Sequence, residues 1–252
     1  MKHAALRRAV VAALAVSTLA LTAACGGDDA DSSKGEGAKA SGGSASPKPV
    51  EAKPLTEAQV KAALLTAKEI PGWKEDKDLS TANAGRDEFQ VGTADDDAKS
   101  CQSMLDALVG GEKAPSPKTE KVLGFSKGDT GPWLMTGVLT YSEKDAKAVM
   151  GTAPVSADCN KVHGDFEGDP ATFTYKETTA PKAGDESRGF RIRVDVEGSE
   201  GGYYVQYDYT YARVGANVVA LTQLSIEKPE TSALEKAFTA AVAKAESVTP
   251  KG

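Results

Sequence analysis

Apolar and polar residues alternate with a period of two along much of the second half of the chain. This alternation is typical of β-strands that bury one face. It predicts four strands, at residues 171–178, 188–197, 203–212 and 217–226. Earlier in the chain, residues 120–126 and 133–141 have the same character, and residues 86–91 are a candidate for a short strand. The short Gly-rich connections between the last strands predict antiparallel neighbours.

Apolar residues at helical spacing occur before, between and after these strands. Thr56 and Gln59 form a capping box at the start of a first helix, which ends at Ile70-Pro71-Gly72-Trp73. Further helices are predicted at residues 95–109, 143–150 and 154–162, the last of only a turn or two. A C-terminal helix with a capping box of Ser232 and Glu235 extends to about Val248.

The order of these elements lacks the strict βαβ alternation of a parallel sheet. We therefore predict the α+β class, with an antiparallel sheet of about five to seven strands and N-terminal, middle and C-terminal helices packed on one of its faces. Residues 55–252 have a length that suits a single α+β domain.

The N-terminal segment has the composition of a secretory signal. Basic residues precede an uncharged run of Ala, Val and Leu, and small residues precede Cys25. Leu21-Thr22-Ala23-Ala24-Cys25 resembles a bacterial lipobox, in which the Cys receives a diacylglyceryl group after cleavage. We expect residues 1–24 to be a lipoprotein signal peptide. The alternatives are an ordinary signal peptide with an incidental Cys25, and a membrane span, which needs about 20 apolar residues.

Residues 25–54 comprise the expected lipidated Cys and a tether of Gly, Ser, Ala, Asp, Lys and Pro. A segment of this composition cannot bury enough apolar surface to offset the entropy of ordering, so we predict disorder. The protein is then expected on the outer face of the cytoplasmic membrane, with the diacylglyceryl anchor in the bilayer.

The net charge excludes two classes of partner. The chain carries −6, and loss of Lys2, Arg7 and Arg8 with the signal changes this to −9. Nucleic acids and anionic bilayers attract clustered Lys and Arg, which this chain lacks. We expect no nucleic-acid partner, and we expect membrane attachment to come from the lipid alone.

Cys101 and Cys159 remain once Cys25 is assigned to the lipid. Export places them in an oxidising compartment, where an even pair indicates a disulfide bond. The alternative is a thiol or metal site, but the chain has no CxxC spacing and no second His in its mature part.

Two motifs suggest catalysis or metal binding. Gly124-Phe125-Ser126-Lys127-Gly128 matches the nucleophile-elbow pattern, and a triad would combine Ser126 with His163 and either Asp145 or Asp158. The motif requires a helix after the Ser, whereas a loop and a strand are predicted there, so a serine hydrolase is the remote alternative.

The acidic residues Asp165, Glu167 and Asp169 are spaced as in a calcium loop. Such a loop needs Gly at its sixth position and Glu at its twelfth, where this chain has Pro170 and Lys176. We predict a solvated acidic loop, no metal site and no cofactor.

One predicted strand has an aromatic face, formed by Tyr203, Tyr207, Tyr209 and Tyr211. Two interpretations remain open. These rings form a core face covered by the C-terminal helix through Leu234, Phe238, Ala241 and Val242, or they line a cleft for an apolar or sugar-like ligand.

From about Leu55 to Val248 the layout resembles the PknH-type extracellular sensor domain of actinobacterial kinases and lipoproteins. The resembling elements are Ala63-Leu64-Leu65 before Ile70-Pro71-Gly72-Trp73, the helical Cys101, Cys159 after another helix, and residues 211–219 in a late hairpin. The resemblance implies an α+β, non-catalytic, disulfide-linked domain that binds an external ligand in a cleft. The chain has one cysteine pair where two disulfides are usual, and no kinase or membrane-spanning region, so no signalling role is implied.

The sequence as a whole favours a non-enzymatic, lipid-anchored, ligand-binding or sensor-like lipoprotein. Its partner would be a small-molecule or cell-wall ligand, and we expect a monomer. The alternative is a carrier of lipids or other apolar molecules, which requires a wide apolar cavity between sheet and helices.

Overall fold

The computed structural model describes residues 51–80, 91–106, 114–151, 156–198, 201–226 and 228–250. The chain divides into the units Met1–Val50 and Glu51–Gly252, and every described residue belongs to the second unit. The predictions for the signal peptide, for Cys25 and for most of the tether lie outside the described residues.

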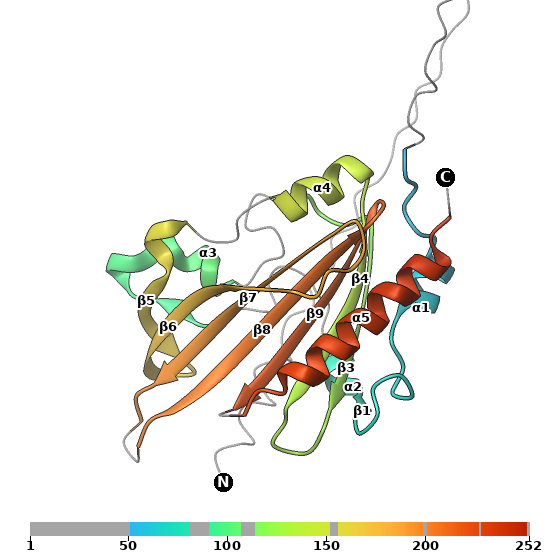
Figure 1. Ribbon diagram of the computed structural model, residues 1–252. Helices are drawn as coiled ribbons and strands as arrows, with labels where there is room; N and C mark the ends of the chain where they lie inside the picture. The colour runs from blue at the N-terminus through green and yellow to red at the C-terminus, as the bar shows by residue number, and fades with distance from the viewer. Residues whose placement is uncertain are drawn as a thin grey trace, which may run out of the picture. The chain divides into compact units, whose positions relative to one another are not determined.

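A single antiparallel sheet organises this unit (Figure 1). Its nine strands follow the order β1-β3-β4-β9-β8-β7-β6-β5-β2. The α+β class is confirmed, but the sheet is larger than the predicted five to seven strands. The strands are β1 Lys74–Asp76, β2 Thr93–Ala94, β3 Thr119–Ser126, β4 Trp133–Thr140, β5 Lys161–Phe166, β6 Asp169–Thr178, β7 Glu186–Val196, β8 Tyr203–Val214 and β9 Asn217–Ile226.

Strand β5 lies where the sequence predicted part of a short helix and an acidic loop, and both predictions were wrong there. The segment expected to be a helical turn and then an acidic loop is mostly a strand, paired with β6 in a hairpin. Its turn is formed by Glu167 and Gly168, both with positive φ (55° and 92°), as a tight two-residue hairpin requires. The buried face of β5 carries only two apolar side chains, Val162 and Phe166, because the position between them is Gly164. The alternation was therefore too weak to predict a strand. Of the candidate strand 86–91, only Val91 is described, and it is not in a strand.

The helices are short except the last one. They are α1 Glu57–Ala63, α2 Lys77–Ser80, η1 Asp96–Cys101, α3 Gln102–Leu105, α4 Glu143–Gly151, η2 Ala157–Cys159 and α5 Thr231–Val248. The capping box of Thr56 and Gln59 is confirmed. The helix predicted at 95–109 begins instead as a 3₁₀ helix, η1, and continues as the single turn α3. No described helix combines the length and apolarity that a membrane span needs.

The start of α5 does not use the predicted capping box of Ser232 and Glu235. The N-cap is Glu230, which makes no side-chain cap hydrogen bond. The buried amide of Gln223 holds this point instead, because its Oε1 accepts from the Glu230 N–H (3.0 Å) and its Nε2 donates to the Glu230 carbonyl (3.3 Å). A side chain of β9 therefore fixes where α5 begins, and local sequence around Ser232 cannot reveal this.

The helices cover both faces of the sheet, and not one face as predicted. Helices α1 and α5 contact each other and pack with Phe125, Val138 and Leu221 in one core cluster. Figure 1 shows α5 lying across β9 and β4 with α1 beside it. On the opposite face, α4 packs on β7, β8 and β9, and η1 and α3 pack beside the outer strands β5 and β2. Phe173, Ile192 and Tyr209 belong to the core cluster of this face. We call these the α5 face and the tyrosine face.

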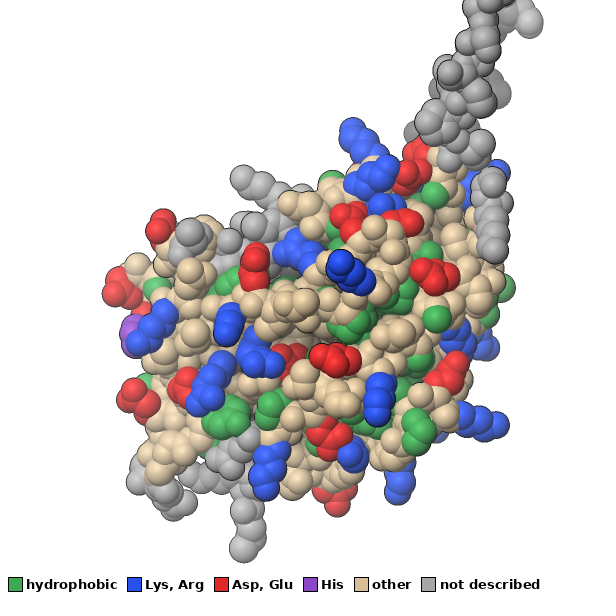
Figure 2. Space-filling view, in the orientation of Figure 1, with side chains coloured by type: hydrophobic (Ala, Val, Ile, Leu, Met, Phe, Trp, Pro, Cys, Tyr) green, Lys and Arg blue, Asp and Glu red, His purple; other side chains and the backbone are tan. Residues whose placement is uncertain are grey.

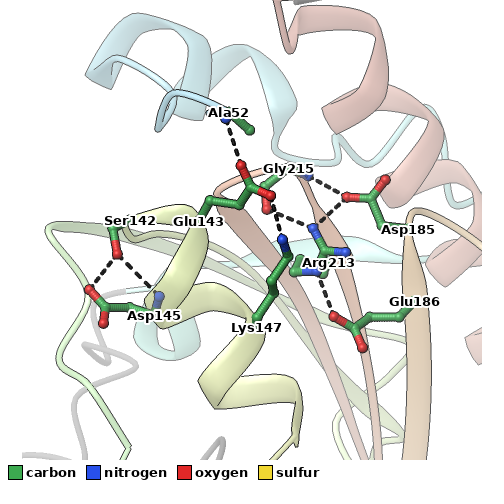
Figure 3. A network of polar contacts seen from close by, with 9 residues as sticks. All are labelled: Ala52, Ser142, Glu143, Asp145, Lys147, Asp185, Glu186, Arg213 and Gly215. Atoms are coloured by element: carbon green, nitrogen blue, oxygen red, sulfur yellow. Dashed lines mark hydrogen bonds and ion pairs between the residues drawn. The ribbon is translucent and has the colours of Figure 1, made fainter. Parts of the chain in front are cut away.

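The described chain begins beside the turn between β8 and β9 (Figure 3). The backbone N–H of Ala52 donates to Glu143 Oε2 on α4 (2.7 Å), and the Leu55 N–H donates to Asn217 Oδ1 (2.9 Å). A hydrogen bond from Lys147 and the Ala52 N–H lower the pKa of Glu143. Arg213 pairs with Asp185 at the same end (2.7 Å). These contacts fix the first described residues to the β8–β9 end of the domain.

Cys101 and Cys159 lie at disulfide distance, with their Cα atoms 5.4 Å apart, which fits the sequence expectation. Cys101 ends η1 and Cys159 ends η2, which is separated from β5 by Asn160 alone. Both are buried in the cluster of the tyrosine face. The bond therefore ties the η1–α3 segment to the outer part of the sheet.

Removing this disulfide should lower the free energy of unfolding by about 4 kcal/mol, as the chain-entropy relation gives for a sequence separation of 58. Urea denaturation of Cys101→Ala measures the loss. The double variant Cys101→Ala/Cys159→Ala and the wild type under reducing conditions should unfold at similar urea concentrations. Equal stability of the oxidised wild type and the variants would contradict a stabilising bond.

Candidate functional site on the tyrosine face

The odd-numbered tyrosines of β8 share one face, as the alternation predicted, but they differ in burial. Tyr209 and Tyr211 are 2% and 3% exposed. Phe190 on β7 stacks on Tyr209 with ring centroids 4.5 Å apart and lies 5.8 Å from Tyr211. Tyr203 and Tyr207 are only half-buried. The first pair therefore belongs to the core, and the second pair forms a surface.

Helix α5 does not cover these rings, which corrects the packing prediction. Leu234, Phe238, Ala241 and Val242 belong to the cluster of the α5 face, together with Ala212 and Val214 of β8. Even-numbered residues of β8 point to that face, because successive side chains of a strand alternate. The buried tyrosines pack instead with Ala146, Val149 and Met150 of α4. Arg188 anchors this helix by donating to the Met150 carbonyl (2.8 Å).

Half-buried apolar side chains continue from Tyr207 across the sheet. In the register of the strands, Tyr207 pairs with Leu224 and Leu224 pairs with Trp133. All three are half-buried, as are Met135, Tyr203 and Ile226 on the same face, whereas Val205 and Tyr209 beside Tyr207 are buried. We define the open aromatic surface as Trp133, Met135, Tyr203, Tyr207, Leu224 and Ile226. It combines one indole and two phenols with aliphatic side chains, a composition that suits an apolar or ring-shaped ligand.

Sequence analysis found the two tyrosines of this surface but missed its other members. Leu224 and Ile226 fall on one face of the predicted last strand, so periodicity could have identified them. Trp133 and Met135 reach the site only because β4 pairs with β9, two strands far apart in the chain. No local pattern reveals that pairing.

Two carboxylates border the surface at the β5–β6 turn. Burial, together with the charges of Glu167 and Asp169, raises the pKa of the Tyr203 phenol. Burial and the charge of Glu167 also raise the pKa of Tyr207. Desolvation and the charge of Asp169 raise the pKa of Glu167 itself. The phenols therefore stay neutral at physiological pH and can donate hydrogen bonds beside two acceptors.

This surface lies at the end of β8 that is remote from the first described residues. Tyr203 begins β8 and Val214 ends it beside the turn that contacts Ala52 and Leu55. Twelve strand residues at about 3.3 Å per step separate these ends by roughly 36 Å. Tyr203 is thus among the described residues farthest along the sheet from the start of the domain.

The triad proposed as the remote alternative does not form. Ser126 ends β3 and His163 lies in β5, with β4, β9, β8, β7 and β6 between these strands. Six interstrand steps of about 4.8 Å separate them by roughly 29 Å along the sheet. His163 Nδ1 lies 3.1 Å from Thr172 Oγ1 instead. The metal interpretation also gains no support, since the described part of the chain contains no group of three His, Cys, Asp or Glu side chains able to hold an ion.

Among known proteins, the chain has similarity to solved structures. No protein-family model matches the chain, and no curated protein matches it. Among solved structures, the chain is similar to the extracellular domain of PknH from Mycobacterium tuberculosis, with a TM-score of 0.44 and 17% identity. The match covers 77% of this chain and 96% of that domain. At this TM-score and identity, the likeness assigns neither a family nor a function.

The division between core and surface tyrosines can be tested by truncation. Tyr209→Ala should lower the free energy of unfolding by about 3–5 kcal/mol, because it removes a buried ring that stacks on Phe190. Tyr203→Ala should cost less than half as much, since its ring is partly in solvent. Thermal and urea denaturation of the two variants provide the comparison. Equal losses would show that Tyr203 is also a core residue.

Proposed function

We propose that this protein is a non-enzymatic, lipid-anchored binding protein of the cell envelope, which takes an apolar or ring-containing ligand on the open aromatic surface. The observation that carries the proposal is the half-buried row of Trp133, Leu224 and Tyr207, which crosses three strands of a rigid sheet. Large contiguous apolar patches are rare on the surface of a monomer and mark interaction sites, and this row of partly exposed apolar side chains is a candidate for such a site. The neutral phenols beside it would orient the ligand by hydrogen bonds.

The arrangement of the domain supports an anchored role. Cys25 precedes the first described residue by 26 positions of Gly-, Ser- and Pro-rich chain. The chain then begins the domain at the β8–β9 end, whereas Tyr203 lies at the opposite end. A lipid on Cys25 would therefore be joined to the domain through residues at its β8–β9 end.

Anchoring is tested at Cys25. Intact-mass analysis of the membrane fraction should show cleavage before Cys25 and a diacylglyceryl adduct on it. Cys25→Ser should remove the adduct and leave the protein in the medium or as uncleaved precursor. A processed Cys25→Ser protein that remains bound to the membrane would contradict the proposal, whatever the ligand-binding result.

Ligand binding is tested with the two tryptophans of the chain. Trp133 belongs to the open aromatic surface, whereas Trp73 is 6% exposed in the cluster of the α5 face. Fractions of the host's own cell-envelope extract are titrated into the unanchored Cys25→Ser protein. A binding fraction should change the emission of Trp133, so the response should persist in Trp73→Phe and disappear in Trp133→Phe.

The same titration identifies the surface. Tyr203→Ala should weaken binding of the active fraction by about fivefold or more, because a partly buried aromatic contact of about 1 kcal/mol is lost. Lys236→Ala, an exposed change on α5, is the matched control and should bind as the wild type does. No emission change with any fraction, or a response that depends on Trp73, would refute the site.

A further inference from the structure

The α5 face of the sheet holds the buried polar side chains of the domain. Among the described residues, each buried polar or charged side chain belongs to this face by its position on β4, β8 or β9. They are Thr136, Thr140, Gln206, Asp208, Thr210, Asn217, Gln223 and Ser225. Asn217 and Gln223 are explained by their backbone hydrogen bonds to the N-terminal segment and to α5. The hydrogen bonds of Asp208, in contrast, join it to side chains of β7 and β8 and hold no other segment.

Asp208 is the centre of a polar network on β7 and β8. Its side chain is 8% exposed, and Arg191 Nε donates to its Oδ1 (2.6 Å). Gln206 Nε2 donates to its Oδ2 (2.5 Å). Each carboxylate oxygen thus has one partner and can accept a further hydrogen bond. At the same place, the side-chain oxygen of Gln206 can accept hydrogen bonds and the other N–H groups of Arg191 can donate them.

Two hydroxyls beside this network are buried without a partner. Thr210 is the next residue of β8 on the same face, and Ser225 pairs with Gln206 in the register. Thr210 is 6% exposed and Ser225 is 1% exposed, and neither hydroxyl makes a hydrogen bond in this structure. Leaving a buried hydroxyl unpaired destabilises a protein, so each such group requires an explanation. A ligand that reaches the network and supplies these hydrogen bonds is one.

A partly exposed pair of an aromatic ring and a guanidinium group adjoins the network. Arg193 lies over the ring of Tyr204, with the guanidinium carbon 3.9 Å from the ring centroid. Asp195 accepts from Arg193 at 2.6 Å and holds the guanidinium in place. Tyr204 and Arg193 are both half-buried. Figure 2 shows Lys and Arg side chains gathered over β6 and β7, to one side of α5, with carboxylates among them.

We infer that this polar cluster, in which Arg191, Arg193 and Tyr204 are partly exposed and Gln206, Asp208 and Thr210 are buried behind them, binds a glycan. A sugar presents hydroxyls that donate and accept, and these match a site that combines a carboxylate, an amide, two guanidinium groups and hydroxyls. Its ring face packs on an aromatic platform such as Tyr204. A phosphate or other simple anion fits less well, because Asp208 and Asp195 already neutralise Arg191 and Arg193. This site is separate from the open aromatic surface, which lies on the other face of the sheet.

The probe is a β-1,4-linked tetramer of N-acetylglucosamine, titrated into the full mature chain by calorimetry or NMR. Thr210→Val is the decisive variant, because valine keeps the shape of threonine and replaces its hydroxyl group by a methyl group. It should keep or raise the melting temperature of the free protein, because an unpaired hydroxyl is removed, and it should weaken sugar binding about fivefold. Tyr204→Ala should weaken binding by a similar factor through loss of the platform.

Two controls define the site. Tyr203→Ala, which changes the other face of the sheet, should bind the tetramer as the wild type does. Inorganic polyphosphate, titrated in parallel, should bind more weakly than the sugar. The inference fails if the tetramer does not bind at millimolar concentration, if polyphosphate binds instead, or if Thr210→Val lowers the melting temperature and leaves sugar affinity unchanged. None of these outcomes bears on the Trp133 response that tests the proposed function.

Discussion

The alternation of side chains along β8 is the constraint on which the rest of the domain depends. This strand pairs along its length with β7 on one side and with β9 on the other. A slip of one residue would carry Tyr209 and Tyr211 to the α5 face and would bring Asp208 under α4. The Phe190 stack opposes such a slip on one face, and the Arg191–Asp208 pair opposes it on the other. The register is therefore set from both faces at once.

The sequence predicted the parts of the fold whose signals are local. Six long strands show a clear period of two, Thr56 and Gln59 sit three residues apart, and two cysteines remain after the lipobox. Strand β5 was not predicted, because Gly164 interrupts its alternation of apolar residues and because the acidic turn after it resembles a loop. The first residue of α5 was not predicted correctly, because it is fixed by the hydrogen bond from the Glu230 N–H to Gln223, a residue of β9. In both cases, contacts with another part of the sheet determine the local structure, and the local sequence does not show them.

Neither the apolar stripe of α5 nor the alternation along β8 is enough to predict on which face of the sheet α5 packs. The apolar stripe of α5 fits any apolar surface, and β8 offers an aromatic one on its odd positions and a mixed one on its even positions. The smaller residues decide the outcome: Ala212 and Val214 let the helix approach, with Val219 of β9 beside them. The tyrosine face then takes the shorter α4, which covers Tyr211 and leaves Tyr207 half-buried. The candidate site exists because that cover is short.

The two faces of β8 carry side chains of different chemistry. Tyr203 and Tyr204 are consecutive residues at the start of β8, so they point to opposite faces. Tyr203 borders an apolar surface with two carboxylates at its edge, and Tyr204 borders a network of charged and amide groups. The contacts of Ala52 and Leu55 fix the start of the domain to the other end of β8. Tyr203 and Tyr204 therefore lie at the end of β8 that is remote from Ala52 and Leu55, on opposite faces of the sheet.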